Sequence, residues 1–395
     1  MKYLFSITLC FSFFLQVQAQ TPTVYFNFIT HNEETGQWNG NLFYTANRSK
    51  LISLTNYFYS KGISWNMQSD WVYLSNVLSK ETPVLMSQTN NKNILRWMYE
   101  DKGVEMDPHA HESVYLYPDV VKLMDSIGLP ESKVIGGTIY NDSNGVNIWT
   151  NLVNGQYGAV FPTRFWKPDY MMGGGTPNHV ADLKYYGFWN PQSPSNYLTH
   201  DTSVHLRHLG VGCTIKIQDT TQVTNIVAQL HDLIDKVQSG QYPGNGFYLQ
   251  TIFFEQAELN DSIFYNKVIA IADSAQAIVN TGAAQWKTFK QAYTIWENAY
   301  QAQMFQWDCG AIATAADQVL SKEGIRVYPN PADEILWVKG LKKNDEVQLM
   351  DLSGRCIQTT DVIADDIPVS INIQSFTPGL YLLRTGGQTI KCYKR

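Results

Sequence analysis

Two histidines separated by one residue, His109 and His111, stand in the segment DPHAHE together with Asp107 and Glu112. The residues before them have the composition of a β-strand, and side chains at positions i and i+2 of a strand point to the same side. Two neutral imidazoles on one side can bind a divalent metal ion when a neighbouring strand supplies a third ligand. The pattern is compatible with a metal site, a catalytic site or an ordinary polar loop.

Two earlier strand-like segments also end in polar residues. The first ends in THNEE, with His31, Asn32 and Glu33, and the second in QSDW, with Gln68, Asp70 and Trp71. Three such clusters in succession favour one shared site, because the carboxyl ends of parallel strands meet at one edge. We expect His31, His109, His111 and Asp107 around a divalent metal ion, with Glu33 or Asp70 as substitutes for His31.

An ion held in this way, with zinc expected, would activate a water molecule for attack on a carbonyl carbon. Asp70 is the expected general base, and Glu33, Asp107 and Glu112 are expected to support it. Asn32, Gln68, Trp71 and Trp166 are candidates for substrate binding, the tryptophans by stacking on sugar rings, although core packing is an equal alternative for them.

Two other functions remain open at this stage. Glu255, at the end of the later strand-like run FFE, could pair with Asp70 or Glu33 as the two carboxylates of a glycoside hydrolase. The polar clusters could also belong to a non-catalytic surface protein that binds glycans.

Strand-like and helical segments alternate from residue 24 onward, and these elements must position the polar clusters. The repetition predicts an α/β fold with a parallel sheet, and the number of strands favours a distorted (β/α) barrel. The glycine- and aromatic-rich segment 150–200 interrupts the repetition and is expected to form loops. Residues 283–307 are expected to form one long helix, and the barrel domain is expected to span residues 21–320.

Composition narrows the class of protein. The chain has 395 residues, 44% of them hydrophobic, and a net charge of −6, which favours two globular domains and argues against a nucleic-acid partner. Residues 1–20 combine one lysine, an apolar run and small residues, so they predict a secretory signal peptide. The apolar run is too short to span a membrane, and no later segment is suited to it. The expected protein is therefore secreted and not transmembrane.

Four cysteines remain beyond the expected signal peptide: Cys213, Cys309, Cys356 and Cys392. Their spacing matches no zinc-binding pattern. They could form one or two disulfides in an oxidising compartment, but their spacing does not show which of them pair.

The tail, residues 325–395, has the short alternating runs of an all-β, immunoglobulin-like sandwich. It contains VYPNPA, DLSGR, PGLYLLR and the basic end KCYKR, in that order. With these motifs it resembles the C-terminal sorting domain of the type IX secretion system. The resemblance implies the secretion machinery as a partner, export through the outer membrane of a Gram-negative bacterium and display at the cell surface.

The main domain resembles the polysaccharide deacetylase (carbohydrate esterase) family. The resemblance rests on the order of its parts: a first strand ending in a polar pair, then the helix LRWMYEDKG leading into the two-histidine strand. The chain has His31-Asn32 where that family has two aspartates, and H-x-H where it has H-x-x-x-H. The resemblance implies a metal-dependent hydrolase that removes acyl groups from the amino sugars of a carbohydrate substrate.

Overall fold

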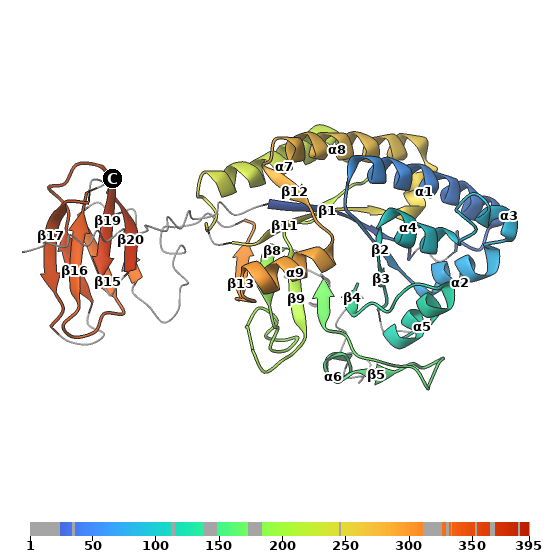
Figure 1. The fold of residues 1–395 in the computed structure, drawn as a ribbon, viewed down its shortest axis with the longest axis horizontal. Helices are drawn as coiled ribbons and strands as arrows, with labels where there is room; N and C mark the ends of the chain where they lie inside the picture. The colour runs from blue at the N-terminus through green and yellow to red at the C-terminus, as the bar shows by residue number, and fades with distance from the viewer. Residues whose placement is uncertain are drawn as a thin grey trace, which may run out of the picture.

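The computed structural model describes most of the chain (Figure 1). The described residues are 24–33, 36–111, 115–137, 148–172, 184–244 and 246–310, and in the tail 326–328, 332, 334–351, 354–363, 368–385 and 388–394. The expected signal peptide and Glu112 lie outside them. Within these ranges no helix is long and apolar enough to cross a membrane.

The first sheet has six strands, and all its neighbouring strands are parallel. Its central strand β1 (Val24–His31) pairs with β11 on one side and with β2 on the other. The remaining strands follow in the order β10-β11-β1-β2-β3, and β12 pairs with the start of β1. Their bounds are Trp65–Ser69 (β2), Glu105–Pro108 (β3), Ile215–Lys216 (β10), Tyr248–Glu255 (β11) and Ala284–Trp286 (β12).

The helices of this part of the chain are α1 (Asn41–Lys61), α2 (Trp71–Lys80), α3 (Pro83–Met86), α4 (Ile94–Lys102), α5 (Tyr117–Ile127), α6 (Ile148–Asn154), α7 (Val223–Gln238), α8 (Ser262–Asn280) and α9 (Phe289–Ala299), with the 3₁₀ turn η4 (Gln256–Asn260). In Figure 1, α1, α7 and α8 run side by side along the first sheet. Helix α1 is followed by Gly62 and α4 by Gly103, both with the positive φ that favours glycine at a helix end.

The second sheet has the order β13-β8-β9-β7-β4. Its strands are β4 (Val134–Gly136), β7 (Tyr170–Met172), β8 (Tyr185–Trp189), β9 (Arg207–Val211) and β13 (Phe305–Asp308), and the short pair β5 (Gln156–Tyr157) and β6 (Phe165–Trp166) lies apart from it. One hydrophobic core lies between the first sheet and its helices, for example Phe28 against Phe58 of α1. A second core joins the two sheets and α9, with Phe188 between Phe247 and Trp296.

The described strands form two sheets and do not close into the single barrel that the sequence favoured. The sheets are joined by one isolated bridge, from His109 to Gly136. The difference arises in the interrupted segment, because β8 pairs antiparallel with both β9 and β13, whereas a (β/α) barrel needs parallel neighbours throughout. The fold is thus a mixed α/β structure with several sheets.

The prediction of one helix over residues 283–307 was wrong. This segment contains β12, α9 and β13 in succession. Helix α9 begins at a capping box, in which Thr288 accepts from the backbone of Gln291 and Gln291 accepts from that of Thr288. The apolar residues on either side pair with β1 and β8 rather than extending the helix.

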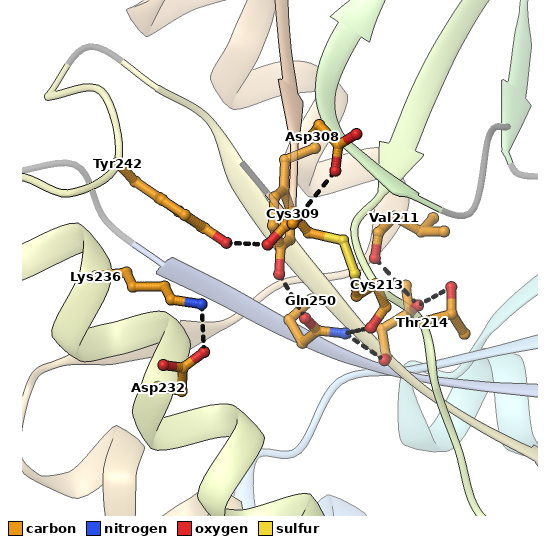
Figure 2. The surroundings of a disulfide bond; sticks show 12 residues. Val211, Cys213, Thr214, Asp232, Lys236, Tyr242, Gln250, Asp308 and Cys309 are labelled. Atoms are coloured by element: carbon orange, nitrogen blue, oxygen red, sulfur yellow. Dashed lines mark hydrogen bonds and ion pairs between the residues drawn. A yellow bond between two sulfur atoms is a disulfide. The ribbon is translucent and has the colours of Figure 1, made fainter. Parts of the chain in front are cut away.

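A disulfide between Cys213 and Cys309 joins the loop after β9 to the end of β13 (Figure 2). The carbonyl oxygens beside it are bonded by side chains: Gln250 donates to Cys213 and Tyr242 donates to Cys309. Cys392 is buried and Cys356 exposed, and both are free thiols. One of the two disulfides that the sequence allowed is therefore present.

The described tail consists of two sheets, as expected of an all-β region. Their orders are β14-β15-β18 and β17-β16-β19-β20. The strands are β14 (Arg326–Tyr328), β15 (Ile335–Lys339), β16 (Glu346–Met350), β17 (Cys356–Asp361), β18 (Val369–Asn372), β19 (Gly379–Thr385) and β20 (Gln388–Lys394). Residues such as Leu336, Leu349 and Leu383 form a separate core between them.

Candidate metal centre

The parallel register brings the predicted polar residues to one edge of the first sheet. His31 ends β1, directly beside Gln68 of β2 and Glu255 of β11. His109 follows β3, and its backbone N–H donates to Ser69 O at the end of β2 at 2.9 Å. The three strand ends therefore meet, as the sequence predicted.

Three side-chain atoms form a contact triangle at this edge. His111 Nε2 lies 2.8 Å from Glu33 Oε2, His109 Nε2 lies 3.2 Å from the same oxygen, and the two nitrogens are 3.0 Å apart. His31 adjoins the triangle: its Nδ1 is 3.7 Å from Glu33 Oε1, and its ring centroid is 4.2 Å from that of His109. His31, Glu33 and His109 each offer a ligand atom within 4.8 Å of the others, and could thus hold a metal ion.

The side chains of the triangle and of His31 differ in how far they are exposed to solvent. Relative exposure of the side chain rises from 2% at His109, through 19% at His31 and 31% at His111, to 37% at Glu33. A ligand can therefore reach the triangle from the side of Glu33 and His111, while His109 closes its inner side.

The charges of the centre are set by burial and by mutual contact. Burial, followed by repulsion from His31, lowers the pKa of His109 to about 3, so its ring is neutral at pH 7. Burial acts to raise the pKa of Glu33, but the hydrogen bonds from His109, His111 and His31 outweigh it and hold that pKa far below its ordinary value. The centre thus combines an ionised carboxylate with a neutral buried imidazole.

Two glycines allow the chain to approach the centre closely. A Cβ atom on Gly137 would lie 2.0 Å from His109 Cε1, and Gly137 has a φ of +80°. A Cβ atom on Gly136 would lie 2.4 Å from Gln68 Cδ. Sequence reasoning missed these residues as part of the site, although a Gly-Gly pair at a strand end signals such an approach.

Asp70 lies beside the centre without joining the triangle. Its carboxylate caps α2 by accepting from the backbone of Tyr73 at 2.8 Å. Burial, together with the nearby charge of Glu33, raises its pKa to about 6. Asp70 is therefore a carboxyl group that changes its protonation near neutral pH within the electric field of the centre.

Asp107 is held by contacts of its own. Asn66 donates to its Oδ2 and Ser132 to its Oδ1, each at 2.6 Å. The carboxyl group is buried, and burial raises its pKa to about 6. Both carboxylate oxygens of Asp107, two residues before His109, are therefore engaged within the protein.

The candidates for substrate binding have different surroundings. Asn32 and Gln68 are fully buried; Asn32 is hydrogen-bonded within the protein, and Gln68 Nε2 contacts Met172 Sδ at 3.7 Å. Trp166 is buried too, and donates to Ser132 O at 2.8 Å. Trp71 is partly exposed and stacks on Tyr115 with ring centroids 4.1 Å apart. Trp71 is therefore the member of this set that solvent reaches.

Glu255, the carboxylate of the glycoside hydrolase alternative, lies beside His31 in the sheet and pairs through Oε1 with Lys216 at 3.2 Å. One of its carboxylate oxygens is therefore engaged by a lysine rather than by the triangle.

Comparison with known proteins assigns the tail. Residues 326–395 match the model of the secretion system C-terminal sorting domain, which confirms the expected type IX sorting domain. The protein is accordingly exported through the outer membrane and attached at the cell surface, with the secretion machinery as a partner. No curated protein matches the chain.

Two solved structures share limited similarity with the chain. One is PorZ, a surface component of the type IX secretion system of Porphyromonas gingivalis, with 19% identity, a TM-score of 0.17 and coverage of 21% of this chain and 13% of that one. The other is the 4-alpha-glucanotransferase of Thermococcus litoralis, with 9% identity, a TM-score of 0.37 and coverage of 69% and 38%. The chain thus spans well under half of either protein, and at these TM-scores neither likeness bears on function.

Proposed function

We propose that His31, Glu33, His109 and His111 bind a divalent metal ion and that the protein is a metal-dependent hydrolase exported to the cell surface. The proposed substrate is a glycan, and the proposed reaction is removal of acyl groups from its amino sugars. The contact triangle of Glu33, His109 and His111 is the observation that carries this proposal.

Hydrogen bonds alone satisfy this triangle poorly. If both histidines donated Nε2–H to Glu33 Oε2, the two N–H groups would also face each other across 3.0 Å. If one nitrogen were unprotonated, its lone pair would face the carboxylate oxygen instead. A cation above the plane of the three atoms accepts a lone pair from each of them, and so suits the arrangement better than any distribution of protons.

The edges of the triangle also favour a class of ion. Ligand atoms about 2.1 Å from one ion lie about 3.0 Å apart at the right angles of an octahedron, and about 3.4 Å apart in a tetrahedron. The edges of 2.8, 3.0 and 3.2 Å fit the octahedral spacing. We therefore propose a six-coordinate ion such as Mn²⁺, Co²⁺ or Fe²⁺ ahead of the zinc expected from the sequence.

Each residue then has a distinct task. A bound divalent ion would polarise a substrate carbonyl group and ease the deprotonation of water. His109 offers a neutral imidazole because its pKa is lowered, and Glu33 supplies the negative charge that balances part of the ion's charge. Asp70, with a pKa of about 6, can accept a proton at neutral pH as the general base.

A glycan is proposed because of the surroundings of Asp70. The next residue is Trp71, a partly exposed ring stacked on Tyr115, and flat aromatic faces suit the apolar faces of sugar rings. A protein attached at the outer surface also meets polysaccharides there.

The proposal is tested by metal titration and by acetate release. The full chain is stripped with a chelator, titrated with Mn²⁺, Co²⁺ and Zn²⁺, and assayed on N-acetylated amino-sugar oligosaccharides. We expect one ion per chain, loss of binding in His109→Ala, and unchanged binding in the control His231→Ala, an exposed histidine of α7. Failure to bind any of the three ions would overturn the proposal.

The glycoside hydrolase alternative has its own result in the same assay. It would require sugar release that survives the chelator and is lost in Glu255→Gln. On the present proposal, Glu255→Gln retains acetate release, whereas the chelator abolishes it.

A further inference from the structure

Asn32 stands between two proposed ligands, His31 and Glu33, and is fully buried. Its Nδ2 donates to Ser69 Oγ at 2.9 Å and to Gln256 Oε1 at 3.2 Å. Its Oδ1 accepts from the backbone N–H of Asp70 at 3.0 Å. One side-chain amide therefore joins the ends of β1, β2 and β11.

The contacts continue from Gln256 to α1. Gln256 Nε2 donates to Asn47 Oδ1 at 2.8 Å, and Asn47 Nδ2 donates back to Gln256 O at 2.9 Å. Asn47 and Gln256 are as buried as Asn32. We refer to Asn32, Gln256 and Asn47 as the amide network.

The amide network also reaches the third ligand strand. Ser69, which accepts from Asn32, in turn accepts through its backbone carbonyl from the N–H of His109 at 2.9 Å. The backbones that carry His31, Glu33 and His109 are thus held by one connected set of hydrogen bonds. A shift of any strand end would break at least one of them.

The donors and acceptors of these three amides are paired within the protein. Each of the hydrogen bonds described above joins a donor to an acceptor at 2.8 to 3.2 Å. A fully paired buried network fixes geometry more strictly than apolar packing, because its bonds depend on direction as well as distance. Apolar side chains could fill the same volume without fixing that geometry.

We infer that the amide network is a positioning device that holds the ligand-bearing strand ends at the spacing needed for metal binding. This inference rests on the proposed function, since it concerns the same centre. Asn32, Gln256 and Asn47 do not touch the ion on this view. They act through His31, Glu33 and His109, as partners behind metal ligands commonly do.

The test compares metal affinity with stability in matched variants. Gln256→Met removes the central amide at similar volume, and Asn47→Leu does the same at the outer end of the network. We expect each to raise the dissociation constant for Mn²⁺ or Co²⁺ by about 10- to 100-fold. The control is Asn76→Ala, which removes a buried amide of α2 that bonds to Asn39 and Val72 instead.

Two readouts separate positioning from plain stability. The melting temperature of the metal-free protein is expected to fall in both Gln256→Met and Asn76→Ala. The affinity for the metal ion is expected to fall only in Gln256→Met. Equal affinity in wild type, Gln256→Met and Asn47→Leu would overturn the inference and leave the proposed function standing. If Gln256→Met does not fold, Asn47→Leu, which leaves the amides of Asn32 and Gln256 in place, decides the question. A wild-type protein that binds no ion would instead overturn the proposed function.

Discussion

His111 Nε2 lies 2.8 Å from Glu33 Oε2 although 78 positions separate the two residues in the chain. The contact forms because Glu33 follows β1 and His111 follows β3, two strands separated only by β2 in a parallel sheet. His111 approaches from the solvent side, whereas His109 approaches from the interior. The two histidines share Glu33 as a partner, but they differ in how much the stability of the folded protein depends on them.

Substituting the two histidines one at a time should therefore distinguish an effect on metal binding from an effect on protein stability. His111→Ala is expected to abolish tight metal binding with little change in melting temperature, because its side chain is 31% exposed. His109→Ala is expected to abolish binding and also to lower the free energy of unfolding by about 1–3 kcal/mol, because it empties a buried position. Calorimetric titration and thermal melting of the metal-free proteins measure the two effects. Equal melting temperatures for both variants would contradict this division.

Asp70 should make the activity fall at acid pH. Its pKa of about 6 means that the carboxylate needed by a general base forms as the pH rises through about 6, so kcat/KM should increase over that range and then level off. Asp70→Asn should remove this pH dependence along with most of the activity, while asparagine still caps α2. A pH profile of both proteins checks this, and an unchanged profile in Asp70→Asn would exclude Asp70 as the base.

The same shift predicts an effect on stability of the opposite sign. Since the native pKa exceeds the unfolded value of 3.8, the native state binds more protons between about pH 4 and pH 6. The contribution of Asp70 to stability is therefore lost as the pH rises through this window. Asp70→Asn should flatten the decline, as urea unfolding of the metal-free protein at pH 4 and pH 6 would reveal.

Gly137→Ala should damage the centre from the side of β4. The new Cβ atom would lie 2.0 Å from His109 Cε1 at a φ of +80°, so the ring or the backbone must move. We expect a loss of about 1–3 kcal/mol in unfolding free energy together with much weaker metal binding. Gly244→Ala is the control, since no atom lies within 4 Å of its added Cβ. Wild-type affinity in Gly137→Ala would show that the close approach is dispensable.

A buried ion pair should contribute strongly to the stability of the α1–α2 region. Arg48 Nε lies 2.7 Å from Glu81 Oε1, with the two side chains only 2% and 3% exposed. Glu81→Gln should cost about 3–5 kcal/mol by leaving the guanidinium charge unpaired, and Arg48→Met with Glu81→Leu should recover much of it. Denaturant unfolding measures both. The exposed pair of Arg96 and Glu100 provides the control, in which Glu100→Gln should have a far smaller effect.

The sequence predicted the first sheet and the meeting of its strand ends, because period-two strands, glycine helix ends and polar clusters are local signals. It could not predict that β8 pairs with β13 rather than with a parallel neighbour. Phe188 and its partner Phe305 are 117 positions apart, and local periodicity carries no information about such distant partners. The closed barrel was expected for that reason.

Within the centre, residue type and spacing grouped His31, His109, His111 and Asp107 as expected ligands, with Glu33 as a substitute. In the structure Glu33 contacts both His109 and His111, whereas Asp107 is engaged by Asn66 and Ser132. The hydrogen-bond partners of the neighbouring polar residues come from distant parts of the chain, so the local sequence did not reveal them. Asp107 is engaged by Ser132, which precedes β4, and Asn32 by Gln256, which is 224 positions away. A polar side chain beside a site can thus serve the substrate or the framework, and only its distant partners tell which.

The disulfide of Cys213 and Cys309 has a mechanical consequence for a protein tethered by its tail. β13 is an edge strand paired with β8, so tension applied from the tail would tend to peel it away one hydrogen bond at a time. The covalent link at Cys309 intercepts that tension at the end of β13 and transfers it to Cys213, next to β9 inside the second sheet. Any force that reaches the folded part through the tail would therefore act at a covalently reinforced point.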